Sequence, residues 1–198
     1  MPDKTLKYYD DNAEGFAGTT ADLAFSDIQD RFLKYLKPGA LILDLGCGSG
    51  RDSRYFLSKG YSVEAIDGSE EMVRIARQVT GLPVRQMLFN ELDETDRYDG
   101  IFACASLLHV PSEELPDIIR RVIKALKNNG IFYVSFKYGD QEGYRNGRYF
   151  TDLQEDTFAQ LMEPFPELVI VEQWVSDDAR PGRSLEKWLN AILVKSGE

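Results

Sequence analysis

The stretch that most constrains this chain is residues 41–50, Leu-Ile-Leu-Asp-Leu-Gly-Cys-Gly-Ser-Gly, in which an apolar strand runs directly into a glycine-rich turn. Glycines at this point allow a tight turn and the close approach of a ligand to the backbone, which a Cβ would block. The residues from about 51 to 59 form a predicted helix whose first N–H groups lack partners within the helix. Asp67 ends the next apolar run, 21 residues after Gly46, where a carboxylate can bind both hydroxyls of a ribose. These features together predict a nucleotide-type cofactor site.

Two classes of cofactor use this geometry, and two residues distinguish them. The dinucleotide fingerprint requires a third glycine at the sixth position, so that the helix N-terminus can face a pyrophosphate. Arg51 stands at that position here. Asp44, two residues before the first glycine, would repel a pyrophosphate but suits a cationic ligand. A sulfonium-bearing amino acid with a free ammonium group therefore fits the motif better than a dinucleotide.

The segment Leu43-Asp-Leu-Gly-Cys-Gly-Ser-Gly50 resembles the first motif of the class I S-adenosylmethionine-dependent methyltransferases, and Asp67 matches their ribose-binding acid. Among chains of this size, the sequence most resembles the small tellurite-resistance-type and general small-molecule methyltransferases. The resemblance implies S-adenosylmethionine as cofactor, S-adenosylhomocysteine as product, and in-line transfer of the methyl group. The implied cofactor contacts are Asp44, Gly46, Cys47, Gly48, Gly50, Asp67, Gly68, Met72, Leu88, Phe89 and Ala105.

One position departs from the family pattern. The family usually has an acid just after the third strand to accept the adenine amino group, whereas this chain has Phe89 and Asn90. We therefore expect Phe89 to offer a packing wall and a backbone N–H to the adenine. Met72 is expected either to pack on the adenine ring or to be an ordinary core residue.

The order of apolar runs predicts an α/β fold. Strands are expected at about 41–45, 61–67, 83–88, from 98 and at 131–136, with helices between them, including one capped by Ser69 and one capped by Ser112. Alternation of this kind implies a parallel sheet with right-handed crossovers. Two closing runs, 168–175 and 188–194, resemble the antiparallel hairpin of the methyltransferase sheet. We therefore predict a doubly wound, mostly parallel seven-stranded sheet with helices on both faces and the last strand antiparallel.

The chain is expected to form one methyltransferase domain over residues 1–198, in three parts. Residues 1–37 would provide an N-terminal lid and a helix from about residue 22, residues 38–136 the cofactor-binding core, and residues 137–198 a loop at 137–148, a helix from about 152 and the closing hairpin. Residues 3–20 predict a short helix and a mobile loop carrying Tyr8, Tyr9 and Phe16. These aromatic residues favour a lid over the alternative of a frayed terminus.

The acceptor site is predicted from residues that follow the later strands. His109, the single histidine of the chain, lies beyond the carboxyl end of the fourth strand, where ligands bind in such sheets. It is expected to be either a substrate contact or base, or a structural hydrogen-bonding residue. Arginines cluster after the fifth strand and between the last two strands, and their planar guanidinium groups suit a small anionic acceptor. We predict substrate contacts at Tyr9, Arg148 and Arg183.

An alternative interpretation of these arginines is that Arg180 and Arg183 pair with nearby acids and simply fasten their loop. Those acids are Asp177, Asp178 and Glu186.

Composition further narrows the kinds of protein and partner that fit this chain. The chain has 198 residues, 43% of them hydrophobic, and a formal net charge of −10, which argues against broad contact with nucleic acid. Cys47 and Cys104 have no metal-type spacing, so no metal site is expected. The absence of a long apolar run or an apolar leader predicts a cytoplasmic protein without a membrane partner. The sequence carries no indication of an oligomeric state.

Three other functions stay open. A nicotinamide-dependent oxidoreductase would leave Asp44 and the missing third glycine unexplained. A nucleic-acid methyltransferase shares the cofactor domain, but the Asn/Asp-Pro-Pro-aromatic motif of adenine amino-methylating enzymes is replaced by residues 105–109, Ala-Ser-Leu-Leu-His. A non-catalytic cofactor-binding module would have the same motif without turnover.

Overall fold

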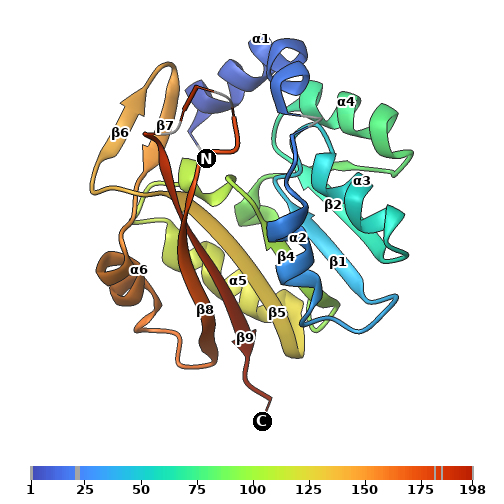
Figure 1. Ribbon diagram of the computed structural model, residues 1–198, viewed down its shortest axis with the longest axis vertical. Helices are drawn as coiled ribbons and strands as arrows, with labels where there is room; N and C mark the ends of the chain where they lie inside the picture. The colour runs from blue at the N-terminus through green and yellow to red at the C-terminus, as the bar shows by residue number, and fades with distance from the viewer. Residues whose placement is uncertain (1, 21–22, 181, 184, 198) are drawn as a thin grey trace.

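The computed structural model describes residues 2–20, 23–180, 182–183 and 185–197. Seven strands form one sheet in the order β3-β2-β1-β4-β5-β9-β8, and β9 runs antiparallel to both of its neighbours (Figure 1). The strands are β1 (Leu41–Leu45), β2 (Ser62–Asp67), β3 (Arg85–Gln86), β4 (Tyr98–Ala103), β5 (Leu126–Lys137), β8 (Leu168–Asp177) and β9 (Lys187–Lys195). The predicted fold class is confirmed.

Helices cover both faces of the sheet because successive strand residues point to opposite sides. In β1, Ile42 packs in the same cluster as residues of α2 (Ser26–Leu33) and α3 (Arg51–Ser58). Leu43 and Leu45 pack in the cluster of α5 (Leu115–Ala125) and α6 (Glu155–Met162) on the other face. α4 (Glu70–Thr80) begins after Ser69, whose hydroxyl accepts a hydrogen bond from the backbone N–H of Met72 as predicted. Within the described ranges, every helix is too short or too polar to span a lipid bilayer.

The N-terminal segment differs from its prediction. Instead of a short helix and a mobile loop, residues Asp3–Thr20 form one continuous helix, α1. Ala13 and Ala17 are buried there in a cluster with Met72 and Ile75 of α4. This packing stabilises α1 despite its two glycines. α1 lies across one end of the sheet, between α4 and the hairpin of β6 (Glu142–Arg145) and β7 (Arg148–Thr151) (Figure 1). The expected start of the next helix, at residue 22, lies outside the described residues.

The predicted loop at 137–148 was wrong. It contains β6 (Glu142–Arg145), which pairs with β7 (Arg148–Thr151) in an antiparallel hairpin. Asn146 and Gly147 connect the strands with φ of 49° and 81°, the conformation that Asn-Gly favours in a tight hairpin turn.

Ser112 does not cap a helix, because α5 begins at Leu115. Its backbone N–H and its hydroxyl instead donate to the Glu142 carboxylate of β6, both at 2.8 Å. Two short 3-10 helices, η1 (Phe89–Glu91) and η2 (Leu107–His109), follow β3 and β4.

Candidate functional site

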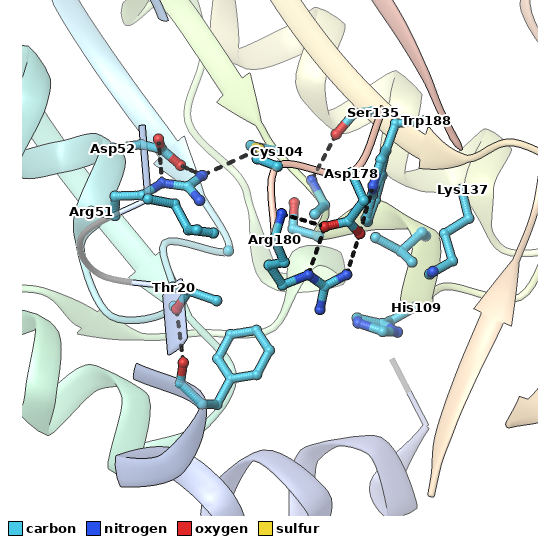
Figure 2. Close-up of a pocket in the computed structure, with 18 of the residues that line it drawn as sticks. Thr20, Arg51, Asp52, Cys104, His109, Ser135, Lys137, Asp178, Arg180 and Trp188 are labelled. Atoms are coloured by element: carbon cyan, nitrogen blue, oxygen red, sulfur yellow. Dashed lines mark hydrogen bonds and ion pairs between the residues drawn. The ribbon is translucent and has the colours of Figure 1, made fainter. Parts of the chain in front are cut away.

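A cavity of about 450 Å³ opens at the carboxyl ends of β1, β2, β4 and β5 and is covered by α1. Its volume lies in the usual range for small-molecule sites. In Figure 2, Arg51 and Asp52 lie on one side of it and Lys137 and Trp188 on the other, with Asp178 and Arg180 between them. The cavity is thus long enough to have two ends with different chemistry, a glycine-turn end and an arginine-rich end.

The glycine turn forms part of the cavity floor, and its glycines have different roles. A Cβ at Gly46 would lie 2.5 Å from the Cβ of Ser106, so this glycine is needed for packing. A Cβ at Gly48 would meet no protein atom within 4 Å, although Gly48 lines the cavity. Both have positive φ, 82° and 53°. Gly48 therefore leaves open backbone beside the space that a ligand would fill.

Asp67 lies at the end of β2 and lines the same end of the cavity. One of its carboxylate oxygens accepts a hydrogen bond from the backbone N–H of Gly48, and the other from that of Ser69, each at 2.9 Å. Burial raises the pKa of the Asp67 carboxyl, and these two hydrogen bonds oppose the rise. The carboxylate is therefore held in one orientation and retains free lone pairs for a diol.

Asp44, predicted to bind the cofactor's ammonium group or a bound water, does not line the cavity. Its carboxylate is buried and accepts hydrogen bonds from the backbone N–H and the hydroxyl of Ser53, at 3.0 and 2.6 Å. Burial, followed by the negative charge of Asp52, raises the pKa of Asp44 to about 7. The acid that lines the cavity is Asp52, which bonds Gln29 at 2.6 Å and Arg51 at 2.8 Å. Sequence analysis missed Asp52, although it follows directly on the glycine turn.

Three more predicted contacts fall outside the cavity lining: Gly50, Gly68 and Leu88. Gly50 packs against α4, where a Cβ would lie 2.7 Å from a side-chain carbon of Thr80. Gly68 packs beneath Leu6 and Leu88, which leaves no room for a Cβ. The other predicted positions at this end, Cys47, Met72, Phe89 and Ala105, do line the cavity.

At the other end, His109 forms two hydrogen bonds that fix its protonation. Nδ1 lies 2.6 Å from the backbone oxygen of Tyr149, which can only accept, so Nδ1 carries the proton. Nε2 then accepts from the hydroxyl of Tyr9 at 2.7 Å. Burial lowers the pKa of His109 to about 4, and burial raises the pKa of Tyr9. Both groups are thus neutral near pH 7, and the lone pair of His109 faces Tyr9.

Arg148 of β7 lines the cavity beside this pair. Its guanidinium carbon lies 4.7 Å from the ring centroid of Tyr8, 5.8 Å from that of Tyr9 and 5.1 Å from that of Phe150. Its Nη1 reaches the Tyr9 hydroxyl at 3.4 Å. Its Nε is buried without any hydrogen-bond acceptor.

The remaining cations at this end are paired. The guanidinium of Arg180 binds the Asp178 carboxylate, with Nε to Oδ1 at 2.8 Å (Figure 2). Arg183 lines the cavity but lies 3.3 Å from a carboxylate oxygen of Glu186, which also binds Lys137. The interpretation that these loop arginines pair with neighbouring acids is thus correct.

Comparison with known proteins agrees with this geometry. Residues 42–130 match the family model of a methyltransferase domain. A methyltransferase of Staphylococcus carnosus (strain TM300) is 30% identical over 122 residues, which cover 58% of this chain and 59% of that protein. The cyclopropane-fatty-acyl-phospholipid synthase of Escherichia coli (strain K12) is 29% identical over 158 residues, covering 78% of this chain and 39% of that protein. The chain thus spans less than two thirds of the length of these relatives.

Solved structures show the same methyltransferase fold over nearly the whole chain. The 1,6-didemethyltoxoflavin-N1-methyltransferase of Burkholderia thailandensis, solved with 1,6-didemethyltoxoflavin and S-adenosylhomocysteine, superposes with a TM-score of 0.80 at 22% identity, covering 97% of this chain and 87% of that chain. The magnesium protoporphyrin IX methyltransferase of Synechocystis PCC 6803, solved with S-adenosylmethionine, gives a TM-score of 0.76 at 18% identity, covering 99% and 98%.

Two residues of α1 that sequence analysis missed join the helix to both sides of the cavity. The hydroxyl of Ser69, beside Asp67, donates to the Asp10 carboxylate at 2.6 Å. The fully buried Thr5 accepts a hydrogen bond from the backbone N–H of Tyr149 at 2.9 Å. α1 is therefore bound to both ends of the cavity. No local pattern signals these contacts, since they join residues 59 and 144 positions apart.

Proposed function

We propose that this chain transfers a methyl group from S-adenosylmethionine to a small anionic acceptor by in-line displacement. The observation that carries the proposal is the open backbone at Gly48 beside the half-buried, oriented carboxylate of Asp67. These groups fit an adenosyl cofactor, because Asp67 has lone pairs for a ribose diol and Gly48 leaves space against the backbone. When bound, the cofactor supplies a methyl group already activated by its sulfonium charge. The protein then has to hold the nucleophile in line and exclude water.

At the cofactor end, Asp67 binds the ribose, while Met72 and Phe89 flank the adenine. Gly46, Cys47, Gly48 and Ala105 line the methionine part. Asp52 takes the role that sequence analysis gave to Asp44, because its carboxylate lines the cavity and favours an ammonium group.

At the acceptor end, Tyr9, Arg148 and Arg183 are the proposed contacts. His109 fixes the orientation of the Tyr9 hydroxyl, since its Nε2 accepts from that group. Residues 1–37 provide the lid that excludes water and a helix, residues 38–136 the cofactor core, and residues 137–198 the acceptor side of a single domain. The net charge of −10 favours a small molecule over nucleic acid. The resemblance to small tellurite-resistance-type methyltransferases supports the same choice.

A thermal-shift titration with S-adenosylmethionine, S-adenosylhomocysteine and NAD tests the cofactor. A ligand at a hundredfold excess over its dissociation constant stabilises by about 2.7 kcal/mol, or roughly 5 to 10 °C in a chain of this size. We expect both sulfur nucleosides to stabilise the wild type and the exposed-acid control Asp140→Ala, and neither to stabilise Asp67→Ala. Stabilisation by NAD alone would contradict the proposal.

A further inference from the structure

Among the cavity-lining cations that the structure describes, one has no carboxylate partner. Arg51, Lys137, Arg145, Arg180 and Arg183 line the cavity and form ion pairs with Asp52, Glu186, Asp152, Asp178 and Glu186, respectively. In the part of the chain that the structure describes, Arg148 has no carboxylate partner, and its buried Nε has no acceptor at all. A buried donor left unsatisfied costs about 1 to 3 kcal/mol. The cost is explained if a ligand supplies the missing acceptor.

The register of the β6–β7 hairpin adds to the case that Arg148 lacks a partner. Arg145 and Arg148 are directly opposite each other across β6 and β7, and like charges in that arrangement destabilise a hairpin. Asp152 compensates only Arg145, which it binds with both carboxylate oxygens. An anion on Arg148 would compensate the second charge.

The surroundings restrict which anion fits. Asp177, Asp178 and Glu186 line the same cavity and already form ion pairs with Lys187, Arg180 and Arg183. One unpaired guanidinium therefore remains to balance a ligand, which favours a singly charged anion over a doubly charged phosphate. His109 contributes no charge, because its Nδ1 proton is bound to a carbonyl and its Nε2 accepts from Tyr9. The rings of Tyr9 and Phe150 also line this end and give it flat apolar walls. One planar, singly charged group next to an apolar ring matches all three features.

We propose that Arg148 is the oxyanion subsite for an acceptor that carries a monocarboxylate on a flat, unsaturated skeleton. The inference rests on the proposed function, because only that function makes the bound carboxylate a methyl acceptor. Binding of a carboxylate to Arg148 can still be measured without methyl transfer.

The test uses benzoate as probe, benzyl alcohol as its uncharged counterpart and inorganic phosphate as a second anion, titrated calorimetrically into protein saturated with S-adenosylhomocysteine. We expect benzoate to bind the wild type at least tenfold more tightly than either other probe. Arg148→Met should weaken benzoate at least tenfold. Arg120→Met is the matched control and should leave benzoate affinity unchanged. Arg120 also lies over an aromatic ring, 5.6 Å from the ring centroid of Phe165, but it does not line the cavity. Arg183→Met should weaken benzoate binding threefold at most.

Equal benzoate affinity in Arg148→Met and wild type, tighter binding of phosphate, or a loss confined to Arg183→Met would each overturn the assignment. Arg148→Lys retains the charge without the planar fork, so it replaces Arg148→Met if that variant does not fold, with the same tenfold weakening expected. If S-adenosylhomocysteine does not bind, the proposed function fails. The same benzoate titrations on the protein alone then decide the Arg148 subsite separately.

Discussion

His109 is the single histidine of the chain, so its protonation can be followed without overlap from other residues. His109 is 3% exposed, and both ring nitrogens form hydrogen bonds, Nδ1 with the backbone oxygen of Tyr149 and Nε2 with the Tyr9 hydroxyl. A second proton would place a buried positive charge near Arg148 and replace the acceptor that Tyr9 uses. We therefore expect the folded protein to resist protonation of this ring strongly.

The magnitude follows from the pKa values. Burial lowers the pKa of His109 to about 4, against about 6.5 for an unperturbed histidine. The unfolded chain therefore binds this proton below pH 6.5 and the folded chain only below pH 4, so stability falls as the pH falls through this window. The full loss is about 3.4 kcal/mol, of which about 2.5 kcal/mol is expected by pH 4.5. Asp44 acts in the opposite direction, because burial raises its pKa to about 7 and the folded state takes up its proton first.

The two effects are separated by measuring urea unfolding of the wild type and of His109→Asn from pH 7.5 to 4.5. Asp44 affects both proteins equally, so the variant should lose about 2.5 kcal/mol less than the wild type over this range. NMR of protein labelled with ¹⁵N-histidine gives the pKa and the tautomer directly. A pKa of 6 or higher, or a neutral form protonated on Nε2, would refute the reasoning about this site.

Three further substitutions test the packing around the cavity. Gly46→Ala should destabilise by at least 2 kcal/mol more than Gly81→Ala. Both glycines have positive φ, and the left-handed strain alone costs roughly 1 to 2 kcal/mol in each variant, but only a Cβ at Gly46 would clash with Ser106. Equal urea midpoints for the two variants would contradict this. Phe102→Ala removes a fully buried ring whose centroid lies 4.4 Å from that of the stacked Tyr133 ring. It should lower the free energy of unfolding by about 3 to 5 kcal/mol, measured by urea unfolding. Asp10→Ala should speed amide hydrogen exchange in α1 with little change in overall stability, since it removes two hydrogen bonds between α1 and the start of α4, from Ser69 and Glu71. Unchanged exchange would show that α1 is held elsewhere.

The fold could be predicted because its determinants are local in the sequence. The strand at 41–45, the glycines after it and the Ser69 cap each act within a few residues, and alternation of apolar runs then leaves few topologies. The assignment of site residues was harder where two neighbouring residues matched the same local pattern. Asp44 and Asp52 both flank the glycine turn, and only the packing of α3 decides that Ser53 binds Asp44 while Asp52 lines the cavity.

The arginine-rich end of the cavity was harder to predict because it depends on pairing between segments. The sequence shows several arginines and several acids at this end but not which charges remain after they pair. The register of a hairpin that was expected to be a loop sets Arg145 opposite Arg148 and leaves Asp152 to one of them. α1, from the other end of the chain, then surrounds Arg148 with the rings of Tyr8 and Tyr9 instead of a carboxylate. The unpaired guanidinium of Arg148 is therefore a property of the assembled fold, and α1 helps to create the proposed acceptor site as well as cover it.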